Sequence, residues 1–127
     1  MSTLVKAGLA YVIPVFAVAF VLGALRVTFV APALGPVLAV ALEVPAVLAL
    51  SWIVAGRVLS RWPLLEKRIA LALLSFALLM LLELATALAF GQTPAQFLAA
   101  MTTPAGALGL AGQIGFALIP LVRQVRG

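Results

Sequence analysis

The amino-acid sequence predicts an all-α integral membrane protein, folded as one bundle of four transmembrane helices that takes up residues 1–127. Hydrophobic residues make up 66% of the chain and charged residues only 9%, and the mean hydropathy is +1.32. Soluble domains average about 45–50% apolar and about 25% charged residues. A soluble fold of 127 residues could not bury this much apolar surface, so lipid must form part of its solvent.

Four segments reach the length of about 20 mostly apolar residues that a membrane-spanning helix requires. They run at about residues 6–28, 34–56, 69–90 and 103–122. The first begins with one lysine and an apolar run, as a signal peptide does. Its apolar run is too long for a signal peptide and ends without a small-residue cleavage site, so we interpret it as a membrane helix.

The connection between the third and fourth spans carries no charge and has two helix-start signals. Thr93-Pro94 and Thr103-Pro104 each read as an N-cap residue followed by proline at the first helical position. A helix over residues 94–101 would place Phe97, Leu98 and Met101 on one side, suited to lying on the outer membrane surface. The alternative for this segment is an ordinary linker.

Basic residues predict the orientation of the chain. Seven of the eight lysines and arginines flank the same ends of the four spans, which by the positive-inside rule places both termini and the middle loop in the cytoplasm. The net charge of +5 therefore indicates topology and contact with anionic lipid, and no nucleic acid partner. The alanine- and leucine-rich composition is typical of a bacterial inner membrane protein. The seven residues are Lys6, Arg57, Arg61, Lys67, Arg68, Arg123 and Arg126, and the exception is Arg26.

Three residue types that carry most enzyme and metal chemistry are missing. The sequence has no cysteine, no histidine and no aspartate, and its only acids are Glu43, Glu66 and Glu83. Disulfides, thiolate nucleophiles, zinc and iron–sulfur sites, histidine-ligated haem and a Ser–His–Asp triad are thereby excluded. We expect no enzymatic activity, no cofactor and no metal site.

The candidate functional residues are polar side chains inside the predicted spans. At about 1.5 Å per residue from the basic flanks, Glu43 and Glu83 lie about 21 and 22 Å from the inner edge, and Arg26 about 30 Å. Gln113 lies near mid-bilayer, and Thr86 shares a helix face with Glu83. The two carboxyl groups are therefore expected at one depth, within reach of Arg26 from above.

Three interpretations of this buried charge cluster stay open. Two carboxylates at one depth repel each other unless one takes up a proton or a cation holds them, which indicates a proton- or cation-coupled site. A structural alternative is an Arg26–Glu latch, with the second glutamate protonated, bonded to Thr86, or bonded to a carbonyl that Pro45 leaves free. In the third, a glutamate faces a partner chain.

The fourth span carries a stripe of glycines at every third position, which indicates close helix packing. A homo-oligomer seam and a hinge for gating are the alternatives. The stripe consists of Gly106, Gly109, Gly112 and Gly115.

Two classes of function fit these features. The first is a small, oligomeric carrier or channel that uses Glu43 and Glu83. The second is a non-catalytic accessory subunit of a larger membrane complex, which binds partner helices, lipid or pigment. A polar path through the bundle would discriminate between them, and on the cytoplasmic half Ser51 and Ser75 are the main candidates for it. The expected partners are membrane lipid and either further copies of the chain or other membrane subunits.

Overall fold

The computed structural model describes residues 2–123, and within this range it contains helices and no strands. Arg126, one of the predicted cytoplasmic cations, lies outside the described residues. Four helices are long and apolar enough to cross a membrane, which confirms the all-α prediction and the expectation of four apolar spans. These helices cover Thr3–Leu34, Pro36–Arg61, Arg68–Ala89 and Pro104–Val122.

The first span is longer than predicted because its helix continues through a change of hydrogen-bond pattern. Helix α1 (Thr3–Leu25) runs into one π-helical turn, η1 (Arg26–Val30), and then into α2 (Ala31–Leu34). A π turn inserts without stopping the helix and is often found at functional positions. The continuous helix ends only at Gly35, whose φ of 88° is accessible to a residue without a side chain.

The second span also extends beyond its predicted end. Helix α3 (Pro36–Arg61) passes through Gly56, where the sequence suggested an end. A Cβ atom at Gly56 would lie only 2.5 Å from Nη2 of Arg123, so this glycine makes room for a guanidinium group within a continuous helix. The third and fourth spans, α4 (Arg68–Ala89) and α6 (Pro104–Val122), start and end within one residue of the predicted positions.

The connection between α4 and α6 folds as a short helix, α5 (Pro94–Ala100). Its start is a capping box, in which the Thr93 hydroxyl accepts from the Gln96 backbone N–H at 3.1 Å and the Gln96 side chain accepts from the Thr93 N–H at 2.9 Å. These bonds satisfy two backbone N–H groups that would lack partners at the start of the helix. A helix of only seven residues can therefore form here.

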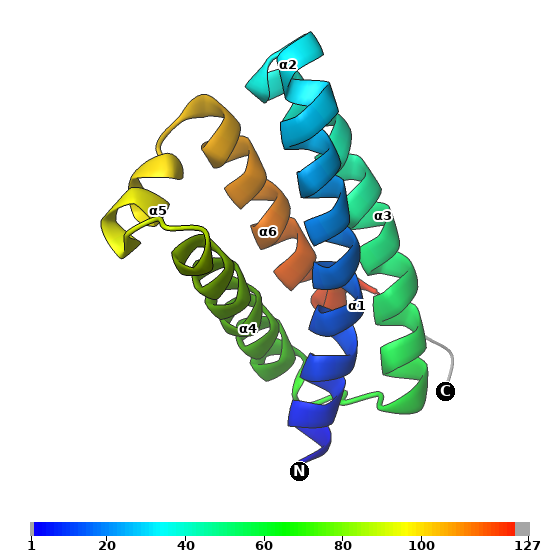
Figure 1. Cartoon of the computed structure of the whole chain (residues 1–127). Helices are drawn as coiled ribbons and strands as arrows, with labels where there is room; N and C mark the ends of the chain where they lie inside the picture. Colours follow the sequence, from blue (N-terminus) through cyan, green and yellow to red (C-terminus); the bar gives the residue numbers. More distant parts are fainter. Residues whose placement is uncertain (1, 124–127) are drawn as a thin grey trace.

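The four long helices form a ring in the order α1, α3, α6, α4. Helix α1 packs against α3 and α4, and α6 packs against the same two helices from the opposite side (Figure 1). The start of α1, the end of α6 and the loop of residues 62–67 lie at one end of the bundle, which we call the basic end. Helices α2 and α5 lie at the other end, called the α5 end below (Figure 1).

The basic end is closed by one arginine at the start of α4. The guanidinium group of Arg68 donates to the carbonyl oxygens of Pro63 at 2.8 Å, Pro120 at 2.9 Å and Arg123 at 3.1 Å. The last carbonyls of a helix lack partners within that helix, so Arg68 satisfies the end of α6. Arg123 in turn donates to the Trp52 carbonyl at 3.2 Å and lies over the indole ring.

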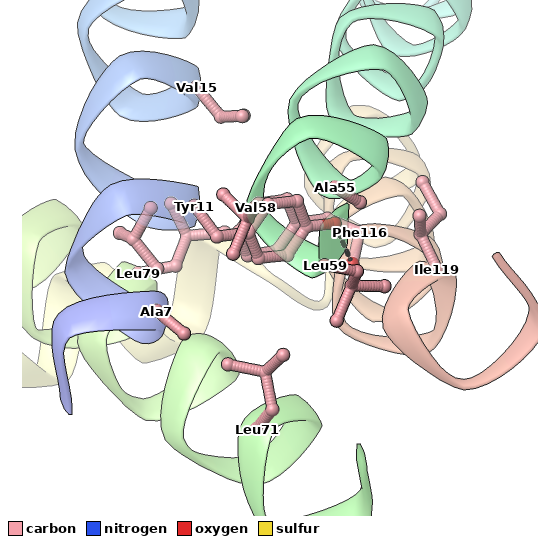
Figure 2. Packing of buried hydrophobic residues seen from close by; sticks show 11 residues of the cluster. Ala7, Tyr11, Val15, Ala55, Val58, Leu59, Leu71, Leu79, Phe116 and Ile119 are labelled. Carbon is pink, nitrogen blue, oxygen red and sulfur yellow. Dashed lines mark hydrogen bonds between the residues drawn. The ribbon is translucent and has the colours of Figure 1, made fainter. Parts of the chain in front are cut away.

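The hydrophobic core occupies the half of the bundle nearer the basic end. At its centre the rings of Tyr11 from α1 and Phe116 from α6 stack across the ring of helices, with centroids 4.3 Å apart and planes 5° from parallel (Figure 2). Aliphatic side chains from α3 and α4 surround this stack (Figure 2). The core consists of Ala7, Tyr11, Val12, Val15, Ala55, Val58, Leu59, Leu71, Leu79, Phe116 and Ile119.

A proline explains the hydrogen bond that accompanies the stack. Pro120 lies within α6 and has no N–H, so the carbonyl oxygen of Phe116 loses its partner four residues along the helix. The Tyr11 hydroxyl donates to this oxygen at 2.5 Å (Figure 2). Since Tyr11 and Phe116 are almost completely buried, no solvent could replace this donor.

The substitution Tyr11→Phe should therefore destabilise the protein by about 1–3 kcal/mol, because it leaves the Phe116 carbonyl unsatisfied while keeping the ring stack. In a Pro120→Ala background the residue at 120 regains its N–H, and Tyr11→Phe should cost markedly less. Thermal unfolding of the four proteins in detergent measures both costs. An equal cost in the two backgrounds would show that the hydroxyl does not compensate for the proline.

Candidate functional site

A cavity of about 460 Å³ lies between the four long helices in the half nearer the α5 end. Its floor includes Phe116 and Leu79, which belong to the core, and on the α5 side Phe97 and Met101 line it. Most of the lining is apolar. The polar residues that line it are Arg26, Glu43, Glu83, Thr103 and Gln113, so four of the five predicted polar site residues share one cavity.

The first polar pair joins α1 to α3. The Nε atom of Arg26, the first residue of the π turn, lies 2.6 Å from Oε2 of Glu43 in an ion pair. Gly23 lies beside this pair, since a Cβ atom there would be in ordinary van der Waals contact with it, 3.4 Å from Nη2 of Arg26 and 3.9 Å from Oε1 of Glu43. The Arg26 and Glu43 side chains are 34% and 16% exposed, so the pair is partly shielded from the surroundings.

The second polar pair joins α4 to α6. The side-chain amide of Gln113 donates to Oε2 of Glu83. The sequence predicted Glu83 as a member of the Arg26 cluster and Gln113 as a separate polar residue. Thr86 was an alternative partner for Glu83, but its hydroxyl donates to the Leu82 carbonyl at 2.8 Å in its own helix.

The two pairs are electrostatically coupled across the cavity. Glu83 lines the same cavity as Glu43, which repels a negative charge on it, and as Arg26, which attracts one. Arg26 is the only lysine or arginine among the described residues that line the cavity, and it is already paired with Glu43. The cavity therefore holds one carboxyl group more than its fixed cation can neutralise.

The predicted glycine stripe serves three different contacts. At Gly112 and Gly115 a Cβ would lie 3.0 Å from Val44 and 3.1 Å from Leu48, so these glycines let α6 approach α3 closely. At Gly106 a Cβ would overlap the Ala100 carbonyl oxygen, so this glycine admits the chain leaving α5. Gly109 lines the cavity, as Gly106 and Gly112 also do, and the nearest atom to its Cβ position is 4.0 Å away.

The two serines considered for a polar path do not extend the cavity. Ser51 and Ser75 are completely buried, and neither lines the cavity. The Ser51 hydroxyl donates to the Val47 carbonyl at 2.6 Å within α3. Ser75 has no hydrogen-bond partner within the described part of the chain. The cavity is therefore confined to the half nearer the α5 end.

The Tyr11–Phe116 stack, whose Phe116 forms part of the cavity floor, is not evident from the hydrophobic pattern. Tyr11 and Phe116 look like ordinary members of apolar helices. The available signal was Pro120, four residues after Phe116, because it frees one buried carbonyl that a hydroxyl elsewhere has to satisfy. Nothing in the sequence indicates that Tyr11 supplies the hydroxyl.

Comparisons with protein-family models, with curated proteins and with solved structures found no match to this chain. Its function therefore has to be inferred from the chemistry of the cavity.

The geometry predicts unequal couplings among the three charged residues. In double-mutant cycles on unfolding free energy in detergent, Arg26→Leu and Glu43→Gln should couple by about 0.5–3 kcal/mol, as contacting residues do. The coupling between Arg26→Leu and Glu83→Gln should be clearly smaller, because the partner of Glu83 is Gln113. Equal couplings would mean that Arg26 holds both acids, and two couplings near zero would mean that the ion pair does not contribute.

Proposed function

We propose that this protein is a small membrane carrier that binds a proton or another cation at Glu83. The observation that carries the proposal is a carboxyl group that lines an intramembrane cavity whose one fixed cation is already paired with Glu43. A charge inside the bilayer is unfavourable, by about 2.5–3.5 kcal/mol at the centre on insertion scales, so an ionisable group within a span points to function.

The chemistry of the two pairs supports reversible binding. Arg26 and Glu43 neutralise each other, and the amide of Gln113 can hold Glu83 in either its protonated or its ionised form. A proton or another single positive charge on Glu83 leaves the whole cavity neutral. Exchange of one for the other therefore changes no net charge inside the membrane.

The shape of the interior favours a carrier over an open channel. The cavity occupies only the half nearer the α5 end, and the Tyr11–Phe116 stack and the aliphatic core fill the other half. A permanent channel would need a polar path through both halves. A cavity on one side is what one state of an alternating-access cycle requires.

The proposal includes an orientation and a location. Both termini and the basic end face the cytoplasm and the α5 end faces outward, because seven of eight basic residues flank the cytoplasmic ends of the spans. The membrane is a bacterial inner membrane. Lipid and further copies of the chain or partner subunits cover the apolar outer faces. We propose no enzymatic activity, since cysteine, histidine and aspartate are absent from the sequence.

A role as a non-catalytic accessory subunit is the second proposal. The observation in its favour is the π turn η1, in which Val27 is 66% exposed and Phe29 is 67% exposed. Large apolar side chains in this position suit contact with partner helices, lipid or a pigment.

Reconstituted vesicles with an acidic interior test the carrier proposal. Addition of external Na⁺, K⁺ or tetraethylammonium should dissipate the pH gradient faster with wild-type protein than with Glu83→Gln, because the variant cannot exchange a proton. An internal pH-sensitive dye records the gradient. Glu66→Gln is the matched control, since this exposed glutamate lies in the loop at the basic end, and it should behave as wild type. Equal rates for wild type, Glu83→Gln and empty vesicles with all three cations would contradict the proposal.

A further inference from the structure

We infer that the ligand of the cavity is a lipophilic organic cation with a single positive charge, which takes the place of the proton on Glu83. This inference rests on the proposed function, because it takes Glu83 as the cation site. The charge, the apolar lining and the volume of the cavity each restrict the class of ligand.

The charged groups around Glu83 set the charge of the ligand. Glu43 from α3 and Arg26 from η1 line the same cavity as Glu83, and these two neutralise each other. Gln113 contributes an uncharged amide from α6, and the residues that line the cavity from α1 and α5 carry no titratable group. One carboxylate is left over, so one positive charge on the ligand completes neutrality. An anion would meet two carboxyl groups and a cation that is already paired.

The lining favours an organic ion over a metal ion. Hard metal cations require six or more oxygen ligands, and the cavity offers two carboxyl groups, one of them paired, an amide and a hydroxyl. Within residues 2–123 no group of three or more histidines, cysteines, aspartates or glutamates could hold a metal ion. Apolar walls instead gain free energy by covering the hydrocarbon part of an organic cation.

The side chains from α5 and the floor suit such a ligand. Phe97 lines the cavity at the α5 end, and aromatic rings attract organic cations through their faces. Met101 adds a flexible, polarisable thioether that adapts to irregular shapes. The volume of about 460 Å³ lies within the range of about 300–1,000 Å³ that small-molecule sites occupy, and it far exceeds what a bare ion needs.

The exchange balances in charge and atoms. The O–H bond of the Glu83 carboxyl group breaks, its proton passes to water, and the resulting carboxylate forms an ion pair with the cation. No covalent bond to the ligand forms. Because binding releases one proton, affinity should rise by up to about tenfold per pH unit in the range where the free protein holds that proton.

Tetraphenylphosphonium is a suitable probe, and tetraphenylborate is its control of the same shape and opposite charge. Equilibrium dialysis in detergent, corrected for protein-free micelles, measures binding between pH 6 and pH 8. We expect wild-type protein to bind one tetraphenylphosphonium per chain, with affinity that rises with pH, and no tetraphenylborate. Glu83→Gln should bind at least tenfold more weakly and without pH dependence, whereas Glu66→Gln should match wild type.

A second variant keeps the test decisive if Glu83→Gln fails to fold. Phe97→Ala removes an aromatic wall that lies outside the hydrophobic core, so it should weaken tetraphenylphosphonium binding severalfold without lowering the melting temperature. Comparable binding of both probes would overturn the inference, since the cavity would then select only by size. Undiminished binding by Glu83→Gln or Phe97→Ala would overturn it as well.

The outcomes separate this inference from the carrier proposal. If Na⁺ or K⁺ dissipates the gradient through Glu83 but tetraphenylphosphonium does not bind, the ligand class is wrong and the carrier proposal stands. If the probe binds through Glu83 and no cation crosses the vesicle membrane, the ligand class stands and the carrier proposal fails.

Discussion

The carbonyl group of Phe116 has to find a hydrogen-bond donor inside the protein, and the arrangement of the bundle depends on how it does so. In lipid no water is available to satisfy a backbone group that a proline leaves free. Pro120 removes the partner of this carbonyl within α6, and Tyr11 supplies a replacement from α1, on the far side of the ring of helices. The bond and the ring stack hold α1 and α6 together although the two helices are not neighbours, and they fill the half of the bundle nearer the basic end.

The half nearer the α5 end is organised by polar pairs between neighbours. Arg26–Glu43 joins α1 to α3, and Gln113–Glu83 joins α4 to α6. The interior between these two pairs of helices is the cavity, since no aromatic stack crosses it there within the described residues. In the proposed carrier the hydroxyl bond of Tyr11 would have to break and re-form for the other half to open.

Composition and hydropathy predict much of this fold, because a helix in lipid needs only enough length and enough apolar residues. The end of the first span was missed, since a π turn at Arg26 has no signature in the hydrophobic pattern. The end of α3 was placed too early because Arg57 was assigned to the basic loop, whereas the helix continues to Arg61 and uses Gly56 to seat Arg123. The partner of Glu83 could not be predicted, because depth along a helix says nothing about which helix is its neighbour.

In the proposed carrier the cavity has to open at the α5 end, and the most direct test uses the absence of cysteine from the sequence, which allows single-cysteine variants without background. The three variants are Ala19→Cys, Ala55→Cys and Ala95→Cys. Ala19 lines the cavity, Ala55 lies in the core, and Ala95 lies on the exposed surface of α5. A membrane-impermeant, positively charged thiol reagent is applied to intact cells and, separately, to inverted membrane vesicles. We expect modification of Ala19→Cys and Ala95→Cys from outside the cell only, and none of Ala55→Cys from either side. Modification of Ala19→Cys from the cytoplasmic side, or from neither side, would contradict a cavity that opens outward at the α5 end.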